Sequence, residues 1–308
     1  LFSIYFFFFS FKKIDKIFFF GTSPPRTLFS AVLFNFFKKT QIVYWILDLW
    51  PDTLRDLGYI KSKINFNLLN KLLISLYNSC NLILCQSRTI TKIVKKRTKT
   101  KTFYFPSWCE DEYLYNKNIK INSSKTYKIF FSGNMGQAQD LTSVIKSIYI
   151  LKNQKILWNF IGTGSQFNKI KNELKKLKIQ KKVKFYGKVN SYKASKLLRQ
   201  ADLLLVTLAR KKIFSYTIPG KLQNYLGLGK PIVGMIDGEA NKLINKNNLG
   251  LACKASDYQQ LSKNILKIKR MSKKQKKLMS KNSLNYVNKN FLKKKLLDQL
   301  RNEYFKKN

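Results

Sequence analysis

The sequence of 308 residues contains no histidine and only four cysteines. Without histidine, the chain cannot form the Ser-His or Cys-His pairs that activate the nucleophiles of most hydrolases. The cysteines show none of the paired spacings typical of zinc ligands; they are Cys80, Cys85, Cys109 and Cys253. We therefore expect no metal site, and we expect each cysteine to pack as a small apolar side chain.

Acidic residues are also scarce, because 15 aspartates and glutamates stand against 60 lysines and arginines, for a formal net charge of +45. One interpretation of this excess is a basic nucleic-acid-binding protein. However, lysine, asparagine, isoleucine and phenylalanine are all abundant, which indicates a general composition bias, and the sequence has no zinc-finger, RNP or helix-turn-helix signature. We therefore expect no nucleic-acid partner. A basic surface would instead favour an anionic membrane surface.

Long apolar runs are absent too, since none reaches the roughly 18 residues that a membrane span needs. The apolar start, residues 1–11, ends at a group of charged residues and lacks the features of a signal peptide. Its phenylalanines, Phe6–Phe9 and Phe11, suit either a helix that dips into the membrane interface or a buried core helix. Because the chain starts at Leu1 inside this apolar segment, we expect that an N-terminal portion is missing.

Short apolar runs alternate with helical segments along the chain, which predicts parallel sheets covered by helices on both faces. The polar segment 116–126 breaks this alternation and predicts a boundary between two doubly wound α/β domains that face each other. The expected strands are 14–20, 41–47, 81–85, 102–105, 128–131, 156–161, 183–186, 203–208, 232–236 and 249–253.

Helical periodicity also predicts which residues of two helices are buried. Helix 64–79 should bury Phe66, Leu69, Leu72, Leu73 and Leu76. Helix 165–177 should bury Phe167, Ile170, Leu174 and Leu177, with Ser165 as its cap. A third helical segment is expected at 28–37.

Ligands of open α/β sheets bind at the carboxyl ends of the strands, and glycine-rich loops follow two of the expected strands. Glycine permits close approach of the backbone, and a following helix N-terminus offers free N–H groups to an anion. The alternative is a pair of tight turns that need a positive φ, and the sequence leaves both open. The candidate ligand-binding residues of these loops are Gly133, Asn134, Gly136, Gln137, Gly162 and Gly164.

The segment 217–233 predicts a second part of the same site. Thr217 and Pro219 precede a short helix, which Pro219 starts and Gly227 and Gly229 end. Lys221 lies at the N-terminus of this helix, where a diphosphate group would be stabilised without a metal ion. We therefore expect a phosphate-bearing small molecule as the ligand. Asp48 ends a buried strand, and either a site role or structural hydrogen bonding explains it.

Several of these segments together carry a resemblance to a known family. The chain resembles bacterial retaining glycosyltransferases of family 4, which have the GT-B architecture of two Rossmann-like domains. The nearest likeness is to the enzymes related to fucosamine transferases of O-antigen and capsule assembly. The segments that carry it are 22–25 (TSPP), 45–51 (WILDLWP), 132–140 (SGNMGQAQD), 162–164 (GTG), 201–202 (AD) and 218–231 (IPGKLQNYLGLGKP).

The resemblance implies an incomplete acceptor-side domain at 1–120 and a nucleotide-sugar-binding domain at 127–285. A C-terminal helix at 286–308 would pack back towards the N-terminal domain. The implied donor is a nucleotide-diphosphate sugar, with UDP as the expected nucleotide. The implied acceptor is a lipid-linked glycan, at the cytoplasmic face of the plasma membrane.

The resemblance also implies metal-independent transfer, without a cofactor, and with retention of the anomeric configuration. Lys221 would lie near the diphosphate, with Asp48 as a further catalytic candidate. The family commonly has a glutamate where Asn224 stands and another where Tyr216 stands. Asn224 is a candidate to hydrogen-bond the ribose. These departures leave a non-catalytic GT-B scaffold as the alternative to an enzyme.

Overall fold

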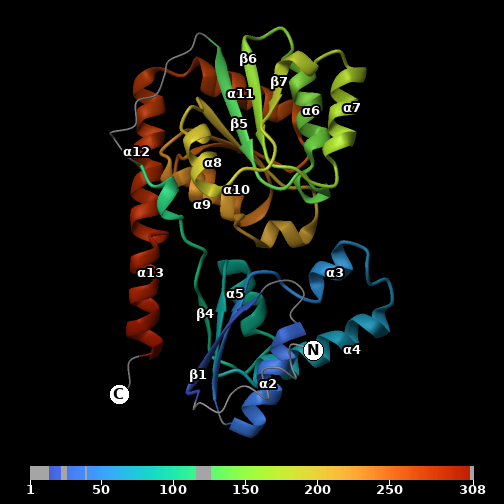
Figure 1. Ribbon diagram of the computed structural model, residues 1–308, viewed down its shortest axis with the longest axis vertical. Coiled ribbons are helices and arrows are strands. Elements are labelled where there is room, and N and C mark those ends of the chain that lie inside the picture. The colour runs from blue at the N-terminus through green and yellow to red at the C-terminus, as the bar shows by residue number, and fades with distance from the viewer. Residues whose placement is uncertain (1–13, 22–25, 39, 116–125, 306–308) are drawn as a thin grey trace. The chain divides into compact units, whose positions relative to one another are not determined.

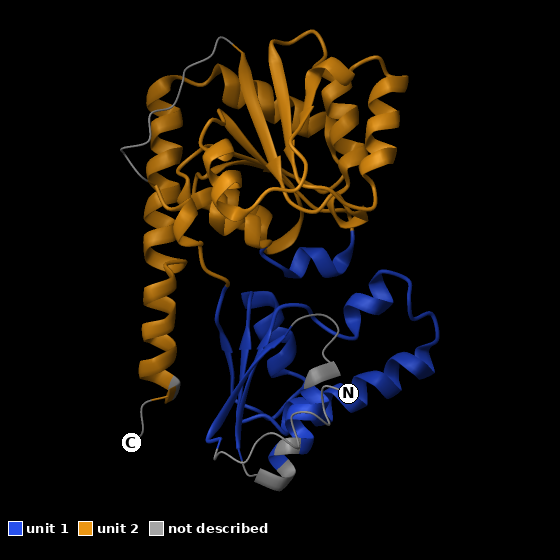
Figure 2. Ribbon diagram, in the orientation of Figure 1, with its two compact units in different colours: residues 1–106, 211–218 blue, residues 107–210, 219–308 orange. Residues whose placement is uncertain are grey.

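The computed structural model describes residues 14–21, 26–38, 40–115 and 126–305 (Figure 1). The chain divides into two compact units (Figure 2). The first unit comprises residues 1–106 and 211–218, and the second comprises residues 107–210 and 219–308. The expected boundary at 116–126 lies almost wholly outside the described residues, and the first unit ends before it, at Pro106.

The first unit contains a four-stranded parallel sheet of order β1-β2-β3-β4. Strand β2 is buried from Ile42 to Ile46, and all four residues of β3 are buried, as expected for parallel strands with both faces covered. The elements are β1 (Lys16–Gly21), α2 (Arg26–Lys38), β2 (Gln41–Ile46), α3 (Asp52–Asp56), α4 (Lys63–Asn78), β3 (Leu82–Cys85), α5 (Arg88–Lys95), β4 (Thr102–Tyr104) and η4 (Lys212–Tyr216).

The second unit contains a six-stranded parallel sheet of order β10-β9-β8-β5-β6-β7. Its first half comprises η1 (Asp111–Tyr113), β5 (Tyr127–Ser132), η2 (Gln137–Gln139), α6 (Leu141–Ile150), β6 (Ile156–Ile161), α7 (Phe167–Lys176), η3 (Gln180–Lys182), β7 (Val183–Phe185) and α8 (Ser191–Leu198). Its second half comprises β8 (Leu203–Thr207), α9 (Gly220–Gly227), β9 (Ile232–Met235), α10 (Gly238–Lys246), β10 (Gly250–Cys253), α11 (Tyr258–Arg270), α12 (Lys273–Asn290), α13 (Lys293–Leu300) and η5 (Arg301–Phe305).

The predicted parallel α/β architecture is confirmed in both units, and the strand order of the six-stranded sheet makes the second unit doubly wound. Each of the ten expected strands is present, with ends that differ by at most two residues. The six-stranded sheet starts at β5, extends through β6 to β7 on one side, and continues through β8, β9 and β10 on the other. This is the strand order of dinucleotide-binding Rossmann folds. The four cysteines are buried and free, as predicted, and burial raises the pKa of each thiol to about 12.

Three local predictions are wrong. Leu72 was expected in the buried face of α4, but 49% of its surface is exposed, because it lies about 100° around the helix from the buried Leu73. Ser165 does not cap α7, which begins after Gln166 without a side-chain cap. Residues 286–305 are not one helix; they form the end of α12, then α13 and η5, and they belong to the second unit.

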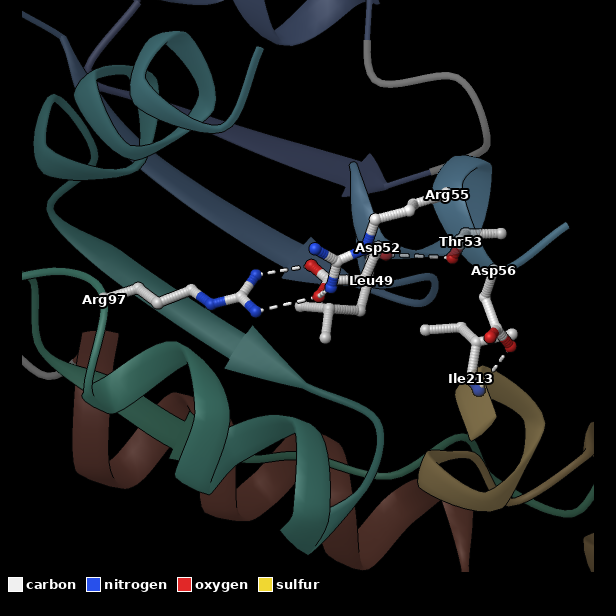
Figure 3. Close-up of polar contacts among 7 residues, drawn as sticks. All are labelled: Leu49, Asp52, Thr53, Arg55, Asp56, Arg97 and Ile213. Carbon is white, nitrogen blue, oxygen red and sulfur yellow. Dashed lines mark hydrogen bonds and ion pairs between the residues drawn. The ribbon is translucent and has the colours of Figure 1, made fainter. Parts of the chain in front are cut away.

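A network of polar contacts holds the segment after β2 in the first unit (Figure 3). The Asp52 carboxylate accepts hydrogen bonds from both terminal nitrogens of Arg97, at 2.5 and 2.9 Å, and Asp52 is buried. Asp56 accepts a hydrogen bond of 2.9 Å from the backbone N–H of Ile213. Ile213 is itself buried in the core of this unit, which explains why residues 211–218 belong to it.

Candidate functional site

The candidate site lies at the carboxyl ends of β5, β6 and β8 in the second unit. The strand order reverses between β5 and β8, and ligands of such sheets bind where this happens. Two hydrogen bonds join the loops that follow these strands. The N–H of Ala209 donates to the carbonyl of Ala138 at 2.8 Å, and the Thr207 hydroxyl donates to the carbonyl of Gln139 at 3.0 Å. The turn η2 is therefore fixed to the end of β8.

The two predicted glycine-rich loops pack backbone against backbone. Gly133 and Gly162 have φ values of +145° and +124°, which L-residues rarely adopt. A Cβ at position 162 would lie 2.1 Å from the carbonyl oxygen of Gly133, and a Cβ at Gly164 would lie 2.4 Å from Oδ1 of Asn134. The contact therefore requires glycine at positions 162 and 164. The structure thus brings together four of the predicted residues: Gly133, Asn134, Gly162 and Gly164.

Lys221 extends from the first turn of α9 to this loop pair. Its Nζ donates to Oε1 of Gln139 at 2.5 Å and lies 3.9 Å from the centre of the Phe131 ring. A Cβ on Gly133 would lie 3.0 Å from the same nitrogen. The amine is thus directed towards the glycine-rich loop after β5.

The surroundings of Lys221 are unusual for a cation. The residue as a whole keeps some contact with solvent, but its amine is enclosed by Phe131, Gly133 and Gln139. This burial lowers the pKa of Lys221 to about 7. Among the described residues, no carboxylate forms an ion pair with it. A buried cation without a counter-charge is costly, and an anionic ligand would remove that cost.

A hydrogen bond from another residue of α9, Tyr225, helps to fix the position of Lys221. Tyr225 lies one turn further along α9 and is buried. Its hydroxyl oxygen accepts a hydrogen bond of 2.7 Å from the backbone N–H of Ser132, at the end of β5. Because residues i and i+4 lie on the same face of a helix, this bond holds the Lys221 side of α9 against the loop.

A pocket of about 250 Å³ lies beside the glycine loops, and Gly136 and Gln137 contribute to its wall. Asp140 also lines it and caps α6, with its carboxylate accepting bonds from the N–H of Ser143 and the hydroxyl of Ser256. The pocket therefore adjoins the N-terminus of α6, as expected for a loop that opens into a helix. The complete lining is Gly136, Gln137, Asp140, Leu141, Thr142, Gln166, Lys169 and Ile170.

The other predicted site residues have local structural contacts. Pro219 is the N-cap residue of α9, as expected. Oδ1 of Asn224 accepts a hydrogen bond of 3.0 Å from the N–H of Glu110, so part of its bonding capacity is used within the protein. Thr217 belongs to the first unit and donates its hydroxyl to the carbonyl of Phe214 at 3.2 Å.

Asp48 also belongs to the first unit, in the segment between β2 and α3. The residue as a whole is exposed, yet neighbouring atoms desolvate its carboxyl group and raise its pKa above the ordinary value. Over the part of the chain that the structure describes, no three His, Cys, Asp or Glu side chains converge as a metal site would require.

Sequence reasoning did not single out Gln139, Phe131 or Tyr225. Gln139 lies in the segment 132–140 that carried the resemblance, but nothing in its spacing connects it with Lys221. Phe131 and Tyr225 are aromatic residues of a buried strand and a buried helix, and the hydrophobic pattern around each of them predicts only that it is buried. Only the fold brings Gln139 and Phe131 to the Lys221 amine, and only the fold brings Tyr225 of α9 to the end of β5.

Comparison with known proteins identifies relatives of the chain. The family model described as glycosyl transferases group 1 matches residues 116–284, which is more than half of the chain. The probable glycosyltransferase WbjE of Pseudomonas aeruginosa is 24% identical over 249 residues, which cover 77% of this chain and 62% of WbjE. The chain thus spans less than two thirds of the length of this relative.

Solved structures share the fold at low sequence identity. HepE of Anabaena, in complex with UDP-glucose, superposes with a TM-score of 0.75 at 13% identity, over 94% of this chain and 78% of HepE. WaaG, described as a glycosyltransferase involved in lipopolysaccharide biosynthesis, gives a TM-score of 0.70 at 14% identity, over 92% of this chain and 84% of WaaG. The two Rossmann-like units are therefore those of the GT-B fold, as expected.

Proposed function

The chain belongs to the glycosyl transferases of group 1, and we propose that it transfers a sugar from a nucleotide-diphosphate sugar to a lipid-linked glycan. The second unit would bind the donor, and the first unit would bind the acceptor. UDP is the proposed nucleotide, because HepE, which shares the fold, binds UDP-glucose. The proposed sugar is a hexose or an N-acetylhexosamine.

The enclosed amine of Lys221 is the observation that carries this proposal. When the bond between the sugar and the diphosphate breaks, negative charge develops on the departing nucleotide. The Lys221 amine would stabilise that charge, since its hydrogen bond to Gln139 fixes it in place before the reaction. We propose that it does so without a metal ion, and that the transfer retains the anomeric configuration, as in the family 4 enzymes that the sequence resembles.

Surface polysaccharide biosynthesis is the proposed setting. The shared fold with WaaG, whose description refers to lipopolysaccharide biosynthesis, supports this choice. O-antigen or capsule assembly is the specific proposal that follows from the fucosamine-transferase resemblance. Because the acceptor implied by the resemblance is lipid-linked, we propose a peripheral position on the inner face of the plasma membrane. Every helix in the described ranges is too short or too polar to cross a bilayer.

Helix α4 supports the proposed membrane association. Ile64, Leu68 and Leu72 lie four residues apart on one face of it, and 79%, 69% and 49% of their surfaces are exposed. Lys63 and Lys71 are also exposed on this helix, which contains no acidic residue. An apolar stripe beside lysines is typical of helices that lie in the interface of an anionic membrane. The other proposed interfacial residues, Phe6–Phe9 and Phe11, lie outside the described residues.

Release of UDP from UDP-sugars tests the proposed reaction. The chain is incubated with UDP-glucose or UDP-N-acetylglucosamine in EDTA, with a lipid-linked glycan as acceptor, and UDP is measured over time. Lys221→Met should lower kcat by about 10²- to 10³-fold, the usual effect of removing one fixed stabilising donor. Lys175→Met, which changes an exposed lysine on α7, should leave the rate unchanged. Equal rates for the two variants would refute the role of Lys221.

A further inference from the structure

The partner of Lys221 is an amide, although a carboxylate would be the usual partner of an enclosed amine. Oε1 of Gln139 accepts the hydrogen bond of 2.5 Å, and Gln139 is half-buried on η2. An amide binds an amine in both protonation states, because its oxygen accepts from the ammonium and its NH₂ group donates to the neutral amine. Gln139 therefore holds the amine in place without neutralising its charge.

The position of Gln139 is itself fixed by the fold. Its backbone carbonyl accepts the hydroxyl of Thr207 at 3.0 Å, and the adjacent Ala138 carbonyl accepts the N–H of Ala209 at 2.8 Å. Both bonds come from the end of β8, on the other side of the point where strand order reverses. The contact between Gln139 and Lys221 thus spans 82 residues of sequence but joins two rigidly held elements.

We infer that Gln139 is the positioning residue of Lys221, and that its neutral amide leaves the charge of the amine available to the diphosphate of a nucleotide sugar. This inference rests on the proposed function. With a carboxylate at position 139, the ammonium would already be paired, and an incoming diphosphate would have to break that pair. With the amide, the first negative charge to reach the amine belongs to the ligand.

No charged group on the elements that pack against α9 forms an ion pair with the Lys221 amine in the described residues. Helix α9 packs against η1, β8 and α12. Strand β8 carries no titratable side chain, and those of α12 are lysines and Tyr286. On η1 and beside it are Glu110, Asp111, Glu112 and Tyr113, and α9 itself carries Tyr225. Asp140, directly after η2, uses its carboxylate to accept bonds from Ser143 and Ser256. Burial is the cause of the lowered pKa of Lys221, and no carboxylate opposes it.

The inference predicts a pH dependence of nucleotide-sugar binding. With a pKa of about 7, the free amine is about ten-elevenths charged at pH 6 and about one-eleventh charged at pH 8. If the diphosphate binds the charged form, affinity should fall about tenfold between pH 6 and pH 8. UDP-glucose is the suitable probe, because both of its phosphates stay fully ionised over this range. Binding should also take up about half a proton at pH 7, which calorimetry in buffers of different ionisation enthalpy measures.

Two variants of Gln139 distinguish the effect of a charge at this position from the effect of losing the hydrogen bond to Lys221. Gln139→Glu should raise the pKa of Lys221 by about one to three units, as an adjacent opposite charge does. It should therefore weaken binding at pH 6 and reduce the difference between pH 6 and pH 8 to about twofold or less. Gln139→Ala should weaken binding but keep the tenfold pH dependence. Gln180→Glu makes the same charge change at an exposed position of η3 and should behave as the wild type.

Competitive acetylation followed by peptide mapping measures the Lys221 amine without any nucleotide. We expect a titration midpoint near pH 7 in the wild type and in Gln180→Glu, and a midpoint at least one unit higher in Gln139→Glu. An unchanged midpoint in Gln139→Glu, or wild-type binding of UDP-glucose that is independent of pH, would overturn the inference. If the wild type bound neither UDP-glucose nor GDP-mannose at any pH, that result would refute the proposed function itself and not only the role of Gln139.

Discussion

Replacing Gly162 by alanine tests whether the two glycine-rich loops must touch. The new Cβ would lie 2.1 Å from the carbonyl oxygen of Gly133, which is 1.3 Å closer than the 3.4 Å of ordinary contact. The loops would have to separate, at about 1–3 kcal/mol for overpacking. The φ of +124° adds about 1–2 kcal/mol of backbone strain for a residue with a Cβ. We therefore expect a loss of about 2–5 kcal/mol in the free energy of unfolding.

Gly187→Ala is the matched control, because Gly187 has a φ of +69° and its Cβ would meet no atom within 4 Å. Gly187→Ala should therefore lower the free energy of unfolding only by the backbone strain of a positive φ, about 1–2 kcal/mol. Urea unfolding measures both variants, and calorimetry with UDP-glucose shows whether separation of the loops also weakens binding. Equal losses of stability in the two variants would refute the close contact between Gly162 and Gly133, and with it this account of the site.

Two further predictions concern the first unit. Asp52→Asn removes the charge from the buried pair with Arg97 and should lower the free energy of unfolding by about 1.5–3 kcal/mol in urea titrations; no loss would contradict the pair. Leu68→Glu should weaken binding to phosphatidylglycerol vesicles about tenfold, the effect of losing one buried leucine at the interface. Leu278→Glu, which changes an exposed leucine of α12, should bind vesicles like the wild type, and equal weakening in both variants would argue against the stripe on α4.

The strands were predictable because a parallel strand buried on both faces is an unbroken apolar run, as in β8, where all five residues are buried. The position of Lys221 was predictable for a similar reason, since Pro219 and Gly229 set both ends of its short helix. Its partner Gln139 was not, because the contact depends on how η2 meets β8. No local pattern encodes a side-chain bond between residues 82 positions apart.

The exposed face of α4 shows the limit of periodicity in another way. Leu72 and Leu73 are both compatible with the helical pattern, and the sequence cannot distinguish the one that packs inward. The buried face of α4 contains Phe66, Leu73, Leu76 and Tyr77, and Leu72 lies on the outer face. The assignment of residues 211–218 to the first unit could not be predicted either, because their sequence does not indicate to which unit they belong.

The two units are interleaved along the polypeptide, and this has a consequence for synthesis. A ribosome completes residues 1–106 long before it reaches Ile213, whose side chain belongs to the core of the same unit and whose N–H bonds Asp56. The earlier unit cannot close its core until most of the sheet strands of the later unit have been made. Expression of residues 1–106 alone should therefore yield a poorly folded fragment, which a peptide of residues 211–218 supplied in trans could help to order.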